Sequence, residues 1–187
     1  MALGILTYMY VESFAHPGRN VVMLEIQPGS TAVDFGAGSG QYTLLLAQTV
    51  GAEGLVYAVD VQPGLLLRIK NEARRRGLDN VEIIVGDIAR PHGAKLRSHS
   101  AHFVLMSNVL FQLEHKRVAL DEAHRILEPG GRLAIIDWSE RAGRIGPSSA
   151  HVYGRREAAR DAASSQFHPT GEFPAGAHHY GLMFEAA

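Results

Sequence analysis

The feature that most constrains the fold is the segment VDFGAGSGQYT at residues 33–43. In it an apolar run reaches an acidic residue, Asp34, and three glycines follow at alternate positions, Gly36, Gly38 and Gly40. Glycine has no Cβ and tolerates a positive φ, so a loop of this kind lets the backbone pass close beside a ligand. Dinucleotide-binding loops have the spacing Gly-x-Gly-x-x-Gly, but a glutamine stands where their third glycine would fall. The tighter spacing therefore predicts a different nucleotide-like ligand.

Composition indicates a soluble globular domain. The chain has 187 residues, of which 46% are hydrophobic, and this length suits one domain with a sizeable core. It contains no cysteine, which excludes disulfides, cysteine zinc clusters and thiol nucleophiles. The formal net charge of −1 provides no general attraction to nucleic acid. No apolar run approaches the roughly 20 residues that a membrane span needs, and the N-terminus lacks the basic start of a signal peptide, so we expect a cytoplasmic location.

Strand and helix patterns alternate along the chain, which predicts a doubly wound α/β fold, with a parallel sheet and helices on both faces. We expect strands at 31–35, 55–59, 81–85, 101–106 and 132–136, and helices at 41–50, 63–76, 115–127 and 151–166. A loop or a poorly formed helix is expected at 90–100, and a loop at 143–149. The tail predicts a hairpin with arms at 167–173 and 179–184. Proline is tolerated in strands mainly at an edge, so Pro169 predicts that the first arm is the outer strand.

Polar residues follow the predicted strands at the edge where ligands bind in such folds, beyond the carboxyl ends of the strands. In chain order they are Asp34, Asp60, Asp87 and the pair Ser107 and Asn108. A carboxylate after the second strand, Asp60, can accept hydrogen bonds from ribose hydroxyls. Asp87 stands beside an apolar residue, Ile88, and together they suit the amino group and ring of adenine. Turn and capping roles remain open for Asp60, Asp87, Ser107 and Asn108.

Taken together, these pieces resemble the class I S-adenosylmethionine-dependent methyltransferases, close to the ubiquinone and menaquinone biosynthesis methyltransferase group. The matching pieces, in the family's order, are VDFGAGSGQYT, VYAVDVQ, VGDI, FVLMSNVLFQL and RILEPGGRLAIIDW, and the tail HHYGLMFE also resembles the family. The resemblance implies a seven-stranded Rossmann-like sheet of order 3-2-1-4-5-7-6 with strand 7 antiparallel. It implies one methyltransferase domain over 1–187, with an N-terminal extension at 1–25, a cofactor-binding core at 26–138, and a loop, helix and hairpin at 139–187.

The same resemblance implies S-adenosylmethionine as the cofactor. The cofactor-binding residues that it implies are Asp34, Gly36, Ala37, Gly38, Gly40, Asp60, Val61, Asp87, Ile88 and Ser107. The glycines and Ala37 would hold the methionine part, and Asp34 would assist by bonding toward its amino group or by holding the loop. Asp60 would hold the ribose hydroxyls with Val61 beside the adenine, and Asp87 and Ile88 would hold the adenine.

The substrate side is less defined, and the sequence nominates no unambiguous general base. The candidates there are Asn108, Trp138, His179 and Tyr180. Structural roles are the alternative for the histidines, and packing under the next helix is the alternative for Trp138. Adjacent strand residues point to opposite faces, so His178 and His179 cannot easily share one metal ion, and we expect no metal site.

The expected reaction is methyl transfer to an unidentified small-molecule or lipid-like acceptor. The fourth strand is not followed by the Asn/Asp-Pro-Pro-Tyr motif of many base-amino methyltransferases, which argues against a nucleic-acid substrate, although other RNA or protein substrates stay open. Arsenite methylation, found in related enzymes, requires cysteines, which this chain lacks. The alternatives are a catalytically inactive cofactor-binding partner subunit and, disfavoured by the glycine spacing, a nicotinamide-dependent oxidoreductase. The oligomeric state is open, and a second subunit could complete the pocket, as in a homodimer.

Overall fold

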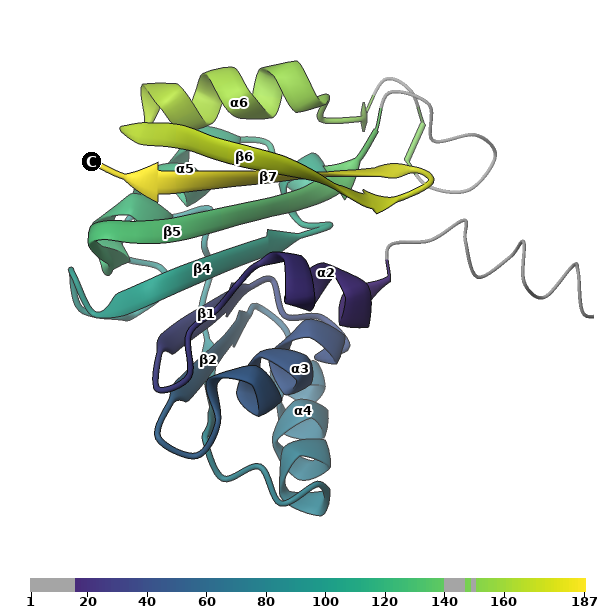
Figure 1. Cartoon of the computed structure of the whole chain (residues 1–187), viewed down its shortest axis with the longest axis vertical. Coiled ribbons are helices and arrows are strands. Elements are labelled where there is room, and N and C mark those ends of the chain that lie inside the picture. The colour runs from purple at the N-terminus through teal and green to yellow at the C-terminus, as the bar shows by residue number, and fades with distance from the viewer. Residues whose placement is uncertain (1–15, 140–146, 149–150) are drawn as a thin grey trace, which may run out of the picture.

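The computed structural model describes residues 16–139, 147–148 and 151–187, which form a seven-stranded sheet with helices packed on both faces (Figure 1). The strands are β1 (Thr31–Phe35), β2 (Leu55–Asp60), β3 (Val81–Val85), β4 (Ala101–Ser107), β5 (Leu127–Trp138), β6 (Phe167–Gly176) and β7 (His179–Ala186). The helices are α2 (Pro17–Met23), α3 (Gln41–Val50), α4 (Pro63–Arg75), α5 (Lys116–Ile126), α6 (Arg155–Ser164) and the short 3₁₀ helix η1 (Leu110–Gln112).

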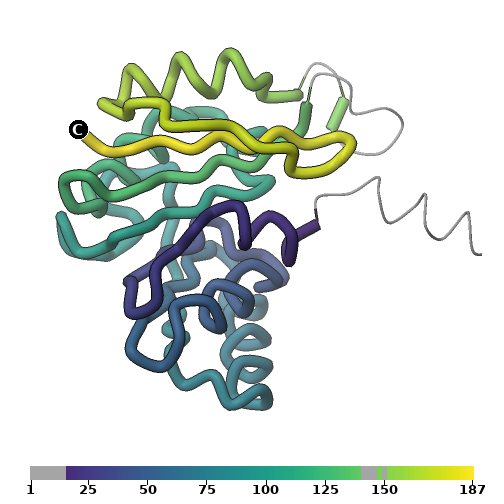
Figure 2. The backbone as a smooth tube through the Cα atoms, in the orientation of Figure 1, coloured from purple at the N-terminus to yellow at the C-terminus, as the bar shows by residue number. Residues whose placement is uncertain are grey.

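The strand order across the sheet is β3-β2-β1-β4-β5-β7-β6, as predicted. β1 to β5 run parallel, whereas β7 pairs with β5 in the antiparallel direction and β6 pairs with β7. β6 therefore forms an edge of the sheet and contains Pro169, which confirms the prediction made from that proline. Figure 2 shows the C-terminal hairpin lying alongside β5.

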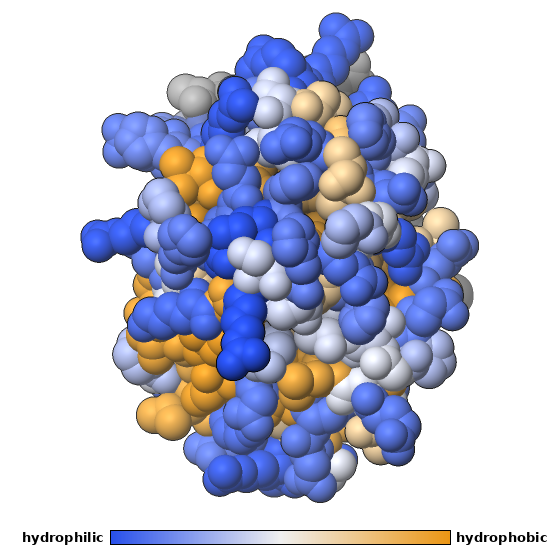
Figure 3. Space-filling view, turned by 90° about the vertical axis from the view of Figure 1, so that its left-hand side faces the viewer, coloured by the Kyte–Doolittle hydropathy of each residue, from blue (hydrophilic) through white to orange (hydrophobic). Residues whose placement is uncertain are grey.

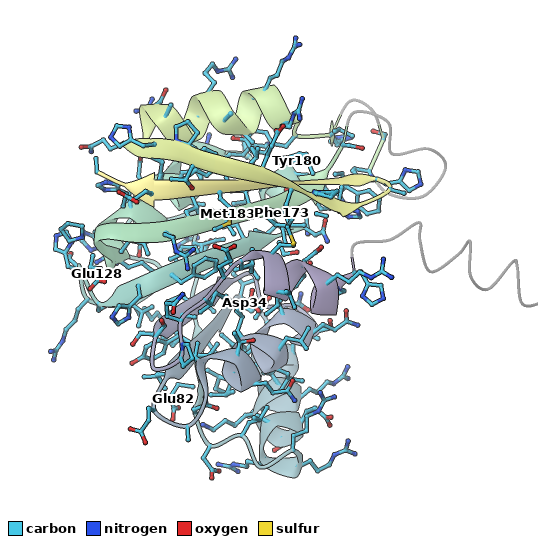
Figure 4. The ribbon with its side chains drawn as sticks, viewed as in Figure 1. Asp34, Glu82, Glu128, Phe173, Tyr180 and Met183 are labelled. Carbon is cyan, nitrogen blue, oxygen red and sulfur yellow. The ribbon has the colours of Figure 1, made fainter. Side chains whose placement is uncertain are left out.

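Two apolar layers bury the two faces of the sheet. Alternate residues of β1 show the division: Ala32 packs in the layer that contains α2, α3 and α4, and Val33 and Phe35 pack in the layer that contains α5 and α6. Phe173 and Met183, from β6 and β7, belong to the first layer (Figure 4). Because both faces are covered, the central strands read as nearly continuous apolar runs, as parallel strands usually do.

β5 is longer than predicted, because it begins at Leu127 instead of Arg132. Leu127 pairs with Ala101 of β4, and the chain then bulges at the Pro129-Gly130 pair, where Gly130 has a left-handed φ of 77°. The register shifts before the regular pairing resumes at Arg132, so the extra residues are accommodated as an irregularity in the strand. The local turn signal is thus retained as a bulge, and strand pairing on both sides of it extends the strand back to Leu127.

One predicted helix starts later than expected, and one predicted loop lies mostly outside the residues that the structure describes. α6 begins at Arg155, whereas the predicted helix covered 151–166. The predicted loop at 143–149 lies outside the described residues, apart from 147–148.

α2 is an element that the sequence did not predict, and it lies within the expected extension at 1–25. It begins with Pro17, whose fixed φ suits a first helical turn. With only 7 residues it is too short to be stable alone, so it depends on tertiary contacts. The buried amide Nδ2 of Asn20 donates hydrogen bonds to the hydroxyl of Tyr42 (2.8 Å) and to the carbonyl of Ala175 (3.0 Å). These bonds attach α2 to α3 and to β6.

The carboxyl ends of the parallel strands point to the right in Figure 1, and the loops that follow them gather there. The opposite side of the molecule, where those strands begin, is shown in Figure 3 and mixes hydrophilic residues with hydrophobic patches. Among the described helices, none combines the length and the apolar character that crossing a bilayer requires.

Candidate functional site

A cavity of about 390 Å³ lies beyond the carboxyl ends of the first four strands. Its lining residues are Asp34, Gly36, Ala37, Gly38, Ser39, Gln41, Tyr42, Val59, Asp60, Val61, Gln62, Gly86, Asp87, Ile88, Ser107, Asn108, Val109, Gln112 and Leu113. The structure therefore brings together every predicted cofactor residue except Gly40, and adds the predicted substrate-side residue Asn108.

The glycine loop, residues 36–40, forms one wall of the cavity. Gly36, Gly38 and Gly40 have φ values of 75°, 53° and 79°, a region that favours glycine. The backbone N–H of Gly36 donates to the carbonyl of Val59 (2.8 Å), so the loop is tied to the neighbouring strand β2. The loop then leads directly into the first turn of α3, where no side chain caps the free amide groups. An anionic ligand group would be favoured there by the helix dipole.

Asp60 lies at the end of β2 and is only 9% exposed. Its Oδ2 accepts a hydrogen bond from the N–H of Gly38 (2.9 Å), and its Oδ1 accepts one from the N–H of Gln62 (2.9 Å). The carboxylate is therefore held between the glycine loop and the start of α4. Each oxygen keeps a further lone pair, which can accept a hydroxyl donor from a ligand in the cavity.

Asp34 lies near the middle of the sheet, where its side chain is 2% exposed (Figure 4). Its Oδ2 accepts a hydrogen bond from the hydroxyl of Thr43 on α3 (2.6 Å). Burial raises the pKa of Asp34 from its ordinary value of 3.8 to about 6, against the lowering effect of Thr43 and with a further rise from the charge on Asp60. Two carboxylates thus converge behind the glycine loop.

We expect Asp34→Asn to stabilise the protein above pH 6 and to have a smaller effect near pH 4. The folded protein binds the Asp34 proton more tightly than the unfolded chain, so stability falls as pH rises from about 4 to about 6. At pH 8 the amide should therefore add up to about 3 kcal/mol of unfolding free energy. Urea unfolding of both proteins at pH 4, 6 and 8 tests this. A difference that did not change with pH would show that the Asp34 charge is not the cause.

Asp87 and Ile88, which follow β3, form another part of the cavity wall. The Asp87 side chain is 39% exposed, its Oδ1 accepts a hydrogen bond from the N–H of Ala89 (3.1 Å), and its Oδ2 pairs with Nε of Arg90 (2.9 Å). Ile88 is 6% exposed and belongs to the core layer that contains α5. The cavity thus has an apolar floor beside a carboxylate at this end.

Two buried oxygens at the end of β4 lack hydrogen-bond partners among the described residues: Oγ of Ser107 and Oδ1 of Asn108. Both residues line the cavity. Asn108 also has a φ of 53°, a left-handed conformation that is uncommon outside glycine. Unsatisfied polar groups and strained backbone both cluster at functional sites, so these oxygens fit the polar groups of a ligand.

The segment 109–113, which includes η1, completes the cavity, and the sequence analysis did not assign it a role. Asp137, near the end of β5 and 1% exposed, holds this segment, because its Oδ2 accepts a hydrogen bond from the N–H of Phe111 (3.2 Å). Its Oδ1 accepts a second hydrogen bond from the backbone N–H of Trp138 (2.8 Å). Burial raises the pKa of Asp137 to about 6, although these backbone donors oppose the rise. The signal for the segment was its position directly after the predicted pair Ser107 and Asn108.

Four predicted residues lie outside the cavity lining: Gly40, Trp138, His179 and Tyr180. The rings of Trp138 and His179 are in contact, with centroids 4.3 Å apart and planes tilted by 38°, and the two residues are register partners on β5 and β7. His179 is 6% exposed, neither ring nitrogen has a hydrogen-bond partner among the described residues, and burial with a contribution from His178 lowers its pKa to about 4. Its imidazole is therefore neutral at pH 7.

Tyr180 belongs to the other side of the sheet. Its ring packs in the layer that contains α5 and α6, and its hydroxyl donates a hydrogen bond to the carbonyl of Tyr153 (2.9 Å). Figure 4 shows it on β7, well away from Asp34. The structure therefore does not bring Tyr180 together with the cavity residues, whereas Trp138 and His179 lie on the face that carries Asp34.

The charge pattern of the cavity limits its ligand. Three carboxylates line it, those of Asp34, Asp60 and Asp87, and no lysine or arginine is found among the described lining residues. A ligand with two phosphates would face repulsion from these carboxylates, whereas a ligand with a net positive charge would be attracted. The site is thus suited to a cationic nucleoside.

Comparisons with known proteins agree with this geometry. A family model described as methyltransferase domain matches residues 33–135. An arsenite methyltransferase from Halobacterium salinarum is 33% identical over 120 residues, which cover 64% of this chain and 30% of that protein. A demethylmenaquinone methyltransferase from Geobacillus stearothermophilus is 29% identical over 117 residues, which cover 63% of this chain and 49% of that protein. The chain thus spans half or less of the length of these curated relatives.

A solved structure is similar over almost the whole chain. It is a SAM dependent methyltransferase from Aquifex aeolicus, with a TM-score of 0.84 and 26% identity. The match covers 95% of this chain and 92% of that one.

Proposed function

The chain belongs to the methyltransferase-domain family, and we propose that it binds S-adenosylmethionine in the cavity and transfers the methyl group to a small-molecule acceptor. The observation that carries the proposal is the cavity itself. A glycine loop and the carboxylates of Asp34, Asp60 and Asp87 surround one space without a cationic side chain among the described lining residues. S-adenosylmethionine carries a sulfonium and an ammonium group against one carboxylate, so its net charge suits this lining.

The described residues fit each part of the cofactor. The free amides at the start of α3 would receive the methionine carboxylate, and Asp34 would lie toward the ammonium group. The free lone pairs of Asp60 would accept the ribose hydroxyls, and Asp87 would accept the amino group of adenine. Ile88 and the exposed side chain of Val61 (59%) would cover the adenine ring.

Bound S-adenosylmethionine supplies a methyl group on a positively charged sulfur, which an acceptor nucleophile can displace directly. The protein must hold the nucleophile in line with that group and exclude water. Orientation alone can contribute roughly 7–11 kcal/mol to lowering such a barrier. The tethers of Asp60 to the glycine loop and of Asp137 to the 109–113 segment provide a rigid surrounding for this alignment.

For the acceptor side we propose the end of the sheet where β4, β5 and β7 meet. Asn108 lines the cavity, and the paired residues Trp138 and His179 are the last residue of β5 and the first residue of β7. The two rings are tilted by 38° to each other and His179 is only 6% exposed, so the half-buried Trp138 is the member of the pair that would contact an acceptor. An indole ring at this place favours an acceptor with an apolar or aromatic part.

A quinone-like or other lipid-like acceptor agrees with this surface and with the name of the demethylmenaquinone methyltransferase relative. The other relative is named for arsenite, but this sequence has no cysteine to bind arsenic through sulfur. The expected cytoplasmic location and the absence of a nucleic-acid substrate remain predictions, and the oligomeric state is open, with a homodimer as one possibility.

We expect S-adenosylhomocysteine, the product form of the cofactor, to raise the melting temperature of the protein, and NAD to leave it unchanged. At a ligand concentration of about 100 times Kd the stabilisation is about 2.7 kcal/mol. This corresponds to a rise of roughly 5–10 °C for a domain of this size. Thermal-shift titration with both ligands provides the measurement, and stabilisation by NAD alone would reject the proposal. Binding without turnover on any acceptor would favour an inactive partner subunit.

A further inference from the structure

The loop between β3 and β4, residues 86–100, forms the adenine end of the cavity but contains no regular secondary structure. Three of its non-glycine residues have a positive φ: His92 (58°), Lys95 (56°) and His99 (52°). Each such residue costs roughly 1–3 kcal/mol and persists only where the surroundings over-determine the conformation. Something outside the loop must therefore hold it in place.

Glu122 on α5 holds the loop through its carboxylate, which is almost completely buried at 3% exposure. Its Oε2 accepts a hydrogen bond from the N–H of His92 (3.1 Å), and its Oε1 accepts one from the N–H of Ala94 (3.0 Å). Arg125, also on α5, donates from Nε to Oε2 (2.8 Å) and from an Nη to Oε1 (2.8 Å). The carboxylate thus binds four donors, two from the loop and two from the guanidinium.

Arg125 also contacts the loop directly. Its guanidinium donates to the carbonyl of Leu96 (3.0 Å) and to Oγ of Ser98 (3.2 Å). Burial alone would raise the pKa of Glu122, but Arg125 and the loop amides outweigh that effect and lower it. The pair is therefore charged at neutral pH, and charge-assisted hydrogen bonds of this kind are the stronger ones.

The two amides that Glu122 binds are those of His92 and Ala94, the residues on either side of Gly93. Gly93 in turn contacts the cavity residue Asp87. The carbonyl of Gly93 accepts a hydrogen bond from the N–H of Asp87 (3.1 Å). The contact is tight, because a Cβ on Gly93 would lie 1.8 Å from the carbonyl oxygen of Asp87. A shift of Gly93 would therefore move the backbone of Asp87 and its neighbour Ile88.

We propose that Glu122, clamped by Arg125, is a positioning residue that sets the adenine specificity of the cavity through Gly93 and Asp87. This proposal rests on the proposed function, because it assigns adenine to the end of the cavity at Asp87. Glu122 does not touch the ligand. It acts by holding the Asp87 carboxylate at a position from which it can accept a hydrogen bond from the amino group of adenine.

The test compares two ligands on Glu122→Gln by calorimetry: S-adenosylhomocysteine and S-inosylhomocysteine, which carries an oxygen in place of the amino group. The unaltered protein should prefer the adenosyl ligand, because a carboxylate accepts an amino donor and repels a carbonyl oxygen. In the variant we expect adenosyl affinity to fall about tenfold and inosyl affinity to change by less than about twofold, so that the preference shrinks. A loss of general stability would not change the ratio of the two affinities.

Glu72→Gln is the matched control, because Glu72 of α4 pairs with Arg75 and with Arg76, the residue that follows the helix, and makes no hydrogen bond to a loop amide among the described residues. It should leave both affinities unchanged. If Glu122→Gln fails to fold, Arg125→Lys keeps the charge but loses the two-point contact, and should reduce the preference less. An unchanged preference in the folded variant overturns the positioning role alone. Failure of the unaltered protein to bind S-adenosylhomocysteine overturns the proposed function as well.

Discussion

Replacing Asp60 with alanine should weaken S-adenosylhomocysteine binding by at least about 100-fold, because the ligand would lose the two proposed hydrogen bonds from its ribose hydroxyls to the carboxylate, at about 1.5–3 kcal/mol each. The same change releases the glycine loop, since the N–H of Gly38 donates to Asp60. Calorimetric titration measures the affinity. Asp60→Asn should have a smaller effect, because an amide oxygen still accepts one of these bonds.

Two comparisons make the Asp60 result specific. Asp87→Ala removes a carboxylate that is 39% exposed and already paired with Arg90, so its effect should be smaller, about tenfold. Glu82→Ala removes a surface carboxylate that pairs with Lys70 at the far edge of the sheet (Figure 4), and should leave the affinity unchanged. Circular dichroism would confirm that each variant is folded. An Asp60→Ala protein with unaltered affinity would remove Asp60 from the site.

Gly36→Ala should destabilise the protein by about 2–5 kcal/mol, which combines left-handed backbone strain with a steric clash. The φ of Gly36 is 75°, and a Cβ there would lie 2.5 Å from Cγ2 and 2.9 Å from Cβ of Val109. Relief of the clash would push the 109–113 segment away from the glycine loop. We therefore expect ligand affinity to fall together with the unfolding free energy.

The matched control for Gly36 is Gly29→Ala, because Gly29 has a similar φ of 80° but no atom within 4 Å of the added Cβ. This variant should show the backbone strain alone, about 1–2 kcal/mol. The double variant Gly36→Ala/Val109→Ala should recover part of the difference, since it removes the Cγ2 atom that clashes. Urea unfolding measures all three proteins. Equal losses in Gly36→Ala and Gly29→Ala would contradict the contact with Val109.

The residues that line or support the cavity divide into those that the sequence predicts and those that it does not. The glycine loop, Asp34 and Asp60 were predictable because each lies directly at the end of an apolar strand, and the ends of parallel strands meet at one edge. The buried tethers Glu122 and Asp137 were not predicted. They carry no local signature, because each holds a segment that is distant from it in the sequence.

The side-chain directions of two residues near the C-terminus also could not be predicted from the sequence alone. His179 and Tyr180 are neighbours in the sequence and were both assigned to the substrate side. The pairing of β7 with β5 decides which of them faces the side of the sheet that carries Asp34, and it places Tyr180 in the opposite layer. A shift of one residue in that register would exchange the two.

By itself, the sequence determined the alternation of strands and helices, the strand order through its resemblance to a known family, and the glycine loop with the carboxylates Asp34 and Asp60. These depend on local backbone geometry and on where strands end. Only the tertiary structure decided the docking of α2, the extended start of β5, the 109–113 wall and the attachment of residues 86–100 to Glu122. The reason is physical: each depends on hydrogen bonds or packing between segments far apart in the chain, which no local pattern of residues encodes.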